Sequence, residues 1–272
     1  MSLRRFSLSH LTAPVHNPLE TADIAIATGY DHVGLRLRTP DTGEPGSPLV
    51  GNPALRRELL GRLNGGGVSV LEIEAWMLCG GQAPTDDEAV FETAAALGAP
   101  RLLAVGDRAG RIGMDELCDR FADLCERAAA FELGVDFEPI AHRVGGTLTD
   151  ALTVVAAGRP WGSGLTLDTL HIHRMGLGLE QLGAIDRTLL HTLQFCDAPG
   201  VALDLETWID HSAYNRMVPG EGELPLRDYL RSLPHDLPIA LEVPMQGMAT
   251  RWSPLERARR VIAGARHNLR DG

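Results

Sequence analysis

Residues 134–140, Gly-Val-Asp-Phe-Glu-Pro-Ile, alternate apolar and acidic side chains over a length typical of one strand. Successive side chains of a strand point to opposite faces, so Val135 and Phe137 share one face, and Asp136 and Glu138 share the other. Strands of a buried parallel sheet are usually apolar on both faces. The segment therefore predicts a strand that packs on helices with one face and turns a polar face toward the interior of a closed barrel.

Seven further strand-like runs are predicted along the chain, with helical patterns between them, such as the one that Pro18 begins and Gly29 ends. Most of their starts are about 30 residues apart, the length of a strand, a helix and two connections. The runs cover residues 5–11, 32–38, 68–76, 101–107, 164–170, 189–197 and 238–244.

Eight strand–helix units in 272 residues predict an α/β protein, a single (β/α)8 TIM barrel that spans residues 1–272 as one domain. Such barrels usually need about 250 residues. An open doubly wound sheet is the alternative. Residues 9–13, after the first strand, lack the glycine-rich phosphate turn that such a sheet commonly carries, and this favours the barrel.

Composition limits the classes of partner. Lys and Arg number 25 against 36 Asp and Glu, so the net charge is −11, which argues against binding to nucleic acid or to an anionic membrane surface. No apolar run approaches the roughly 18 residues of a membrane span, and no export segment is visible. The four cysteines form no CxxC pair. We therefore expect a cytoplasmic protein with a small-molecule partner.

Three later strands carry polar residues at the same depth as Glu138, namely Asp168, Gln194 and Glu242. The carboxyl ends of barrel strands meet at one rim, where barrel enzymes build their sites. Carboxylates gathered there repel one another unless a cation neutralises them. The pattern predicts a divalent metal held by Glu138, Asp168 and Glu242, with Gln194 as a neutral fourth ligand.

Salt bridges are the alternative use of these carboxylates. Arg36 and Arg38 of the second strand are candidates to neutralise a pair. Glu74, late in the third strand, either lines the pocket or pairs with Arg36. If they line the pocket, Glu74 and Arg36 are expected to bind the substrate. Three carboxylates and one amide at matching depth favour the cation over separate salt bridges.

Five segments resemble motifs of the xylose isomerase-like TIM barrels, a superfamily of sugar-phosphate isomerases and epimerases that also includes inosose dehydratases and endonuclease IV. The segments cover residues 134–139, 167–171, 193–197, 216–222 and 240–244. The resemblance implies that Glu138 and Glu242 bind the metal and exchange protons with the substrate carbon from opposite sides. It also implies that Asp168 binds the metal, and that His171 and Arg216 contact the substrate.

Gln194 departs from the family pattern, because many members have a metal-binding histidine at this position. An amide binds as a hard oxygen donor, so the departure favours Mn²⁺ or Mg²⁺ over Zn²⁺. It also leaves open a barrel without catalysis, which binds a sugar or a partner subunit.

The expected chemistry is proton transfer beside a carbonyl. A metal that chelates an α-hydroxy ketone acidifies the neighbouring C–H, a glutamate removes that proton, and the cation stabilises the enediolate. Return of the proton gives epimerisation or isomerisation, whereas loss of a β-hydroxyl gives dehydration. The first hypothesis is therefore an isomerase or epimerase of a sugar or small polyol-derived ketone. The second is a dehydratase of the inosose or dehydroshikimate type.

Two features outside the strands complete the expectations. Residues 198–224, after the seventh strand, form the longest connection, and long ordered loops are commonly binding loops or lids. We expect this loop to close over the site. Trp252 and the apolar residues near it mark a candidate interface of a homo-oligomer.

Overall fold

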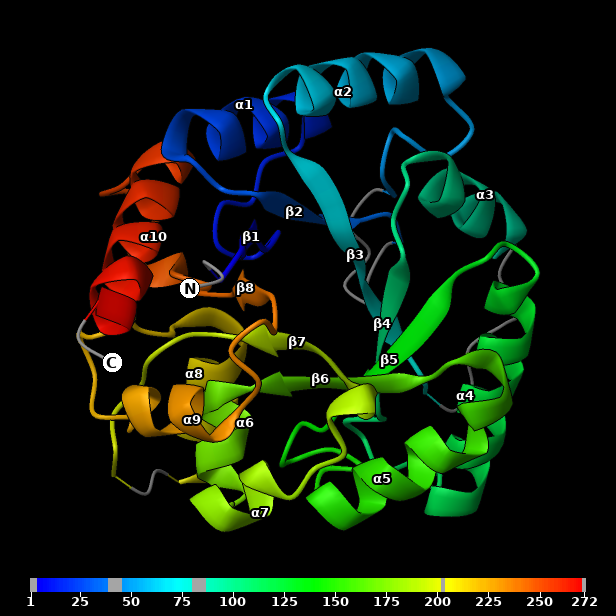
Figure 1. The fold of residues 1–272 in the computed structure, drawn as a ribbon, viewed down its shortest axis with the longest axis vertical. Coiled ribbons are helices and arrows are strands. Elements are labelled where there is room, and N and C mark those ends of the chain that lie inside the picture. Colours follow the sequence, from blue (N-terminus) through cyan, green and yellow to red (C-terminus); the bar gives the residue numbers. More distant parts are fainter. Residues whose placement is uncertain (1–3, 39–45, 80–86, 202–203, 271–272) are drawn as a thin grey trace.

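The computed structural model describes residues 4–38, 46–79, 87–201 and 204–270. Eight parallel strands pair in chain order, and β1 also pairs with β8, so the sheet closes into a barrel. Helices surround the strands (Figure 1). The predicted single (β/α)8 TIM barrel is confirmed. Its strands are β1 (Phe6–Leu8), β2 (His32–Arg36), β3 (Ser69–Met77), β4 (Arg101–Val105), β5 (Gly134–Glu138), β6 (Gly164–Asp168), β7 (Leu190–Gln194) and β8 (Ile239–Leu241).

The helices begin and end where the sequence supplies capping groups. Asn17 accepts a hydrogen bond from the Leu19 amide ahead of Pro18, and Gly29, with φ of 76°, ends the same helix. The helices are α1 (Pro18–Thr28), α2 (Pro53–Gly65), α3 (Glu88–Ala96), α4 (Met114–Ala129), α5 (Leu148–Ala157), α6 (Thr169–Arg174), α7 (Leu179–Gly183), α8 (Leu205–Tyr214), α9 (Leu226–Ser232) and α10 (Pro254–Arg270). None of the helices in the described ranges is both long and apolar enough to cross a bilayer.

The apolar face of β5 packs outward on a helix, as the side-chain alternation of 134–140 predicts. Phe137 of β5 meets Phe121 of α4 edge to face, with ring centroids 5.8 Å apart. The opposite face of β5 carries Asp136 and Glu138. Asp136 is neutralised by Arg101 Nε at 2.6 Å and lies 2.7 Å from His191 Nδ1, so it takes no part in the metal cluster.

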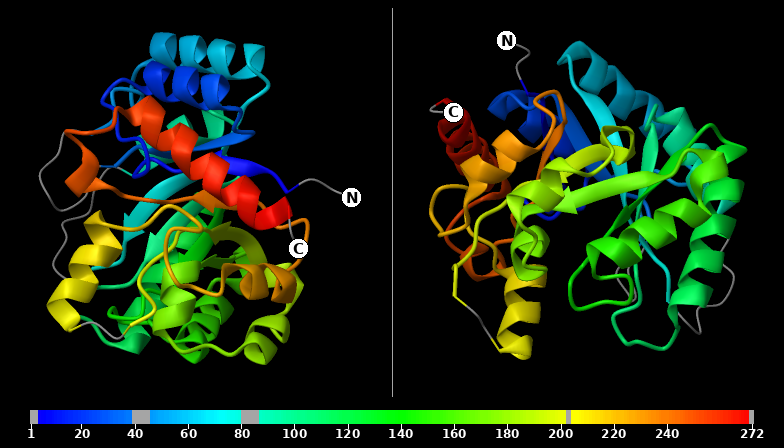
Figure 2. Two further views of the ribbon diagram at one scale, coloured as in Figure 1. Left: turned by 90° about the vertical axis from the view of Figure 1, so that its left-hand side faces the viewer. Right: turned by 60° about the horizontal axis from the view of Figure 1, so that its bottom comes forward.

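Every strand except β3 ends two or three residues before its predicted end. The sixth strand ends at Asp168, because its carboxylate Oδ1 accepts from the backbone amides of Leu170 and His171 and starts α6. His171 therefore lies on a helix and not in a loop, which corrects the expected end of that strand at residue 170. The connection 198–224 contains α8, which lies at the periphery of the molecule in both views of Figure 2.

Candidate metal centre and substrate cavity

Three carboxylates from three parts of the barrel converge at one end of it. Glu138 ends β5, Asp168 ends β6 and Glu242 follows β8 directly. One oxygen of each lies within 4.8 Å of the others, and all three side chains are buried. Gln194 ends β7 with no exposed surface, and its Cα is in register with Asp168. The structure thus brings together the four residues that strand alternation predicts as metal ligands.

Arg216 is the cation that the protein itself places against this cluster. Its guanidinium Nη1 lies 2.7 Å from Asp168 Oδ2 and 2.8 Å from Glu242 Oε2, and its Nε donates to the Ser212 carbonyl at 2.9 Å. The resemblance implies a substrate contact for Arg216, and the structure additionally shows it neutralising two carboxylates. Arg38 lies 3.7 Å from Asp87, away from the cluster.

Two of the carboxylates, Glu138 and Glu242, retain protons more readily than ordinary glutamates do. Burial, with the charges of Glu242 and Asp168, raises the pKa of Glu138 well above its usual range. Burial also raises the pKa of Glu242 to about 7, although Arg216 opposes the shift. Burial lowers the pKa of Arg216, but the charges of Asp168 and Glu242 outweigh it and raise this pKa well above its ordinary value. A single guanidinium therefore does not fully compensate the cluster.

The orientation of the Gln194 amide shows whether these residues suit a metal ion. With its nitrogen toward the cluster, it donates to Asp168 Oδ2 at 3.2 Å and to Glu138 Oε1 at 3.0 Å. With its oxygen in the same place, three acceptors face one another, an arrangement that a cation between them would stabilise. Buried carboxylate and amide oxygens are the donors that a hard divalent ion prefers. The residue set therefore fits a divalent metal.

His171 is neutral and faces both the cluster and α8. Its Nε2 lies 3.8 Å from Glu138 Oε1 and 3.4 Å from Ser212 Oγ, while its Nδ1 is buried with no hydrogen-bond partner among the described residues. Burial lowers the pKa of His171 to about 3. Neutral imidazole offers one donor and one acceptor, so His171 can hydrogen-bond a substrate hydroxyl.

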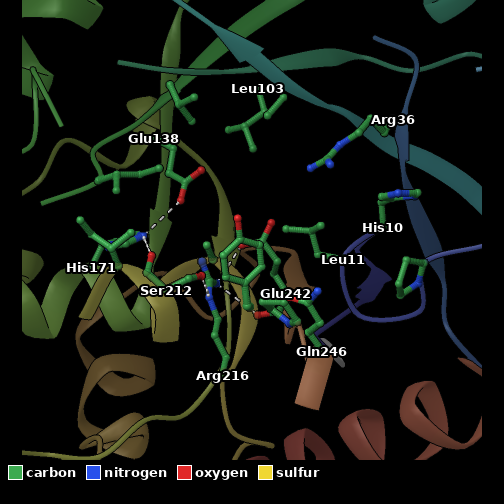
Figure 3. A pocket seen from close by; sticks show the side chains of 18 of the residues that line it. His10, Leu11, Arg36, Leu103, Glu138, His171, Ser212, Arg216, Glu242 and Gln246 are labelled. Carbon is green, nitrogen blue, oxygen red and sulfur yellow. Dashed lines mark hydrogen bonds and ion pairs between the residues drawn. The ribbon is translucent and has the colours of Figure 1, made fainter. Parts of the chain in front are cut away.

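The cluster forms one wall of a cavity of about 440 Å³, within the range of small-molecule sites. Figure 3 shows Glu138 and His171 on one side, and Arg36 and His10 on the opposite side. Four residues of α8, including Ser212 and Tyr214, line the cavity, so part of the connection 198–224 forms its wall.

Of the two further residues expected to bind substrate, Arg36 and Glu74, only one lines the cavity. Arg36 lines the cavity, whereas Glu74 is not among the lining residues. Glu74 accepts from Ser9 Oγ at 2.7 Å and from the His10 amide at 3.2 Å. Within the described ranges, no ion pair of 4.0 Å or less joins Glu74 to Arg36. The two residues therefore form no direct ion pair, although burial raises the pKa of Glu74 and the Arg36 charge opposes that shift.

Strand alternation does not reveal the lining residues that lie on helices and loops. Ser212 of α8, Arg257 of α10 and Arg143 of the loop after β5 all line the cavity. The side-chain alternation of strands places none of them there, and only the packing of the helices against the barrel end does.

The fold and the site together define a TIM barrel with an acidic centre at the carboxyl ends of its strands. The chain belongs to the xylose isomerase-like TIM barrel family, whose model matches residues 23–266. No curated protein sequence matches the chain. Solved structures similar to it include xylose isomerase-like proteins, sugar epimerases and a probable dehydratase.

Several solved structures share the fold at low sequence identity. One is a xylose isomerase-like TIM barrel/4-hydroxyphenylpyruvate dioxygenase fusion protein, with 19% identity and a TM-score of 0.76. The match covers 97% of this chain and 42% of the fusion protein. The IolI protein with a bound zinc atom is 17% identical over 98% of both chains, with a TM-score of 0.73. The probable 3-DHS dehydratase AsbF of Bacillus anthracis is 14% identical over 95% of this chain and 98% of its own, with a TM-score of 0.72. A D-allulose 3-epimerase from Methylomonas sp. in complex with D-allulose is 14% identical over 98% and 97%, with a TM-score of 0.67.

Proposed function

We propose that the protein is a divalent-metal-dependent isomerase or epimerase of a sugar or small α-hydroxy ketone. The observation that carries the proposal is the placement of Glu138 and Glu242. Both line the cavity, come from β5 and from the end of β8, and share one cluster with Asp168. Two carboxylates beside one cation site are suited to take a proton from substrate carbon and to return it. The zinc in the IolI protein and the D-allulose in the epimerase support this choice.

Each residue has a separate task in the proposed reaction. Asp168, Gln194 and the two glutamates would hold the metal, which would polarise a carbonyl and acidify the C–H bond beside it. A glutamate that takes up a proton at neutral pH suits proton transfer, and burial raises the pKa of both Glu138 and Glu242 toward that range. His171 would orient a substrate hydroxyl. Mn²⁺ or Mg²⁺ suits these oxygen donors better than Zn²⁺.

Hydrogen–deuterium exchange tests the proposal directly. The protein loaded with Mn²⁺ is incubated in D₂O with candidate ketoses, and deuterium at the carbon beside the carbonyl is followed by NMR. We expect exchange in the wild type and a loss of about 10²- to 10⁴-fold in Glu138→Gln and Glu242→Gln. Glu256→Gln, at an exposed carboxylate of α10, is the matched control and should keep the wild-type rate.

Metal content completes the test. We expect one divalent ion per chain in the wild type and none in Glu242→Gln, as measured by elemental analysis. Failure to bind any divalent ion would refute the proposal and favour a barrel that binds without catalysis. Exchange accompanied by loss of a hydroxyl would assign the dehydratase reaction instead, the activity that the name of the AsbF structure carries.

A further inference from the structure

The cavity contains more positive charge than the protein neutralises. Five arginines and two carboxylates are among the residues that line it. Arg216 is paired with Asp168 and Glu242, but none of the other four makes an ion pair within 4.0 Å in the part of the chain that the structure describes. The four are Arg36, Arg108, Arg143 and Arg257.

Arg257, in the first turns of α10, is the least compensated of these cations. Its side chain is 6% exposed, and its Nε is buried without a hydrogen-bond partner among the described residues. Burial alone lowers the pKa of Arg257, and no carboxylate opposes that shift. Arginine keeps its charge in proteins even so. A buried charge without a partner is costly, so this position calls for an anion from outside the chain.

Arg36 lines the same cavity as Arg257 and ends a strand close to the one that precedes α10. β8 pairs with β1 and β1 pairs with β2, so the carboxyl ends of these three strands are neighbours. Arg36 ends β2, and α10 follows the connection after β8. The Nε of Arg36 is also buried and unpartnered within the described ranges. Figure 3 places Arg36 across the cavity from Glu138.

The other two arginines are less suited to this role. Arg143 Nη1 already donates to the Gly106 carbonyl at 3.0 Å and contacts Met77 Sδ at 3.6 Å. Arg108 is exposed at the outer edge of the cavity, where solvent screens its charge.

We propose that the substrate is an organic anion, and that Arg257 and Arg36 bind its carboxylate or phosphate group. The planar guanidinium presents two parallel donors that match either group. An anion held on the wall of β8, β1 and β2 leaves the rest of the molecule to extend toward Glu138 and Glu242. The statement that this anion is a substrate rests on the proposed function, whereas the anion site itself does not.

Charge balance also favours an anionic ligand. Three carboxylates against Arg216 and a divalent ion would leave the metal cluster neutral. Among the described residues, the charge of Arg257 would then have no counterpart, and that of Arg36 would be opposed by the buried Glu74 without a direct ion pair. A neutral sugar would leave the Arg257 guanidinium beside it without compensation among the described residues.

Thermal unfolding of the metal-free protein tests the anion site without any turnover. The midpoint is measured with inorganic phosphate or malonate, against sodium chloride at equal ionic strength. We expect at least one of the two to raise the midpoint of the wild type. In Arg257→Gln, its apparent Kd should rise about tenfold or more, because a charged hydrogen bond is lost. The anion that raises the midpoint shows whether the site binds a phosphate or a carboxylate group.

Matched variants separate binding from folding. Arg259→Gln removes an exposed arginine of the same helix and should keep the full shift. Without added anion, Arg257→Gln should unfold at the wild-type temperature or above it, because it removes an uncompensated buried charge. If that variant does not fold, Arg36→Gln is expected to lose the anion shift in its place. A full shift in the folded variant, or no shift in the wild type, would overturn the proposal.

Exchange kinetics distinguish a failure of this inference from a failure of the proposed function. An anion shift without exchange on any ketose would refute the enzyme and leave the anion site standing. Exchange on a neutral ketose, with neither anion shifting the midpoint of the wild type, would refute the anion site and leave the enzyme standing.

Discussion

Arg216→Met should destabilise the metal-free protein strongly, because it leaves two buried carboxylates without their counter-ion. The guanidinium lies 2.7 Å from Asp168 and 2.8 Å from Glu242, and its side chain is 4% exposed. Removing one partner of a buried ion pair typically costs about 3–5 kcal/mol. We expect a loss of this size in the free energy of unfolding at pH 7 with EDTA present.

The size of the loss is limited by protonation. Protonation of a carboxylate costs about 1.4 kcal/mol for each pH unit by which the pH exceeds its pKa. The variant can neutralise its stranded carboxylates in this way, so its deficit should shrink as the pH falls from 7 to 5. Mn²⁺ should also narrow the gap between variant and wild type, because the ion replaces the missing positive charge.

Urea unfolding at pH 7 and pH 5, with EDTA or with Mn²⁺, measures these differences. Arg62→Met is the matched control, because Arg62 lies 2.7 Å from Asp23 on the surface, where both side chains are largely exposed. That pair should contribute less than about 1 kcal/mol. A deficit in Arg216→Met no larger than that of Arg62→Met, or one that does not change with pH, would refute the reasoning.

Three further predictions follow from other buried groups. Mn²⁺ should bind more weakly as the pH falls from 8 to 5.5, because the protons held by Glu138 and Glu242 must leave, and calorimetry in two buffers counts them. Glu72→Gln should stabilise the protein at pH 7 but not at pH 4, as urea unfolding would show. Burial raises the pKa of Glu72 well above its usual range, so the folded state keeps a proton that the unfolded chain releases, at about 1.4 kcal/mol for each pH unit between the two pKa values. Gly34→Ala should lower the free energy of unfolding by about 1–3 kcal/mol, because the added Cβ would overlap the Glu74 carboxylate.

The outcomes that contradict these predictions are equally specific. A Kd for Mn²⁺ that does not change with pH would contradict the prediction on metal binding. An equal effect of Glu72→Gln on the free energy of unfolding at pH 7 and pH 4 would contradict the prediction on Glu72. Gly61→Ala is the control for the third, because an added Cβ on this helix meets no atom within 4 Å. It should stabilise α2 by about 0.5–1 kcal/mol, and similar effects of the two alanines would argue against the clash.

Much of the fold is predictable from the chain, because strand alternation and helix capping are local properties. All eight strands were expected near their observed positions, and Pro18 and Gly29 bound the first helix as expected. The end of β6 was not predicted. The Asp168 side chain accepts a hydrogen bond from the Leu170 amide and so starts α6, and the strand pattern does not indicate this hydrogen bond. The connection 198–224 was expected as a loop, but α8 forms within it and packs against the cavity.

Some residues of the candidate site are also predictable from the sequence, and others are not. Glu138, Asp168, Gln194 and Glu242 are visible in the sequence, because polar residues at the ends of buried strands interrupt an apolar pattern. Glu74 has the same signature, yet it lies outside the cavity lining and is bound by Ser9 instead of Arg36.

The sequence by itself determined the barrel, the inward direction of its acidic residues and the strand ends at which they meet, because these depend on spacing along the chain. Only the tertiary structure decided which charges neutralise one another. Arg216 reaches Asp168 across 48 residues, and Arg257 lines the cavity from α10 with no carboxylate of the described ranges paired to it. Charge pairing depends on distance in space, and no periodicity of a single strand or helix records that distance.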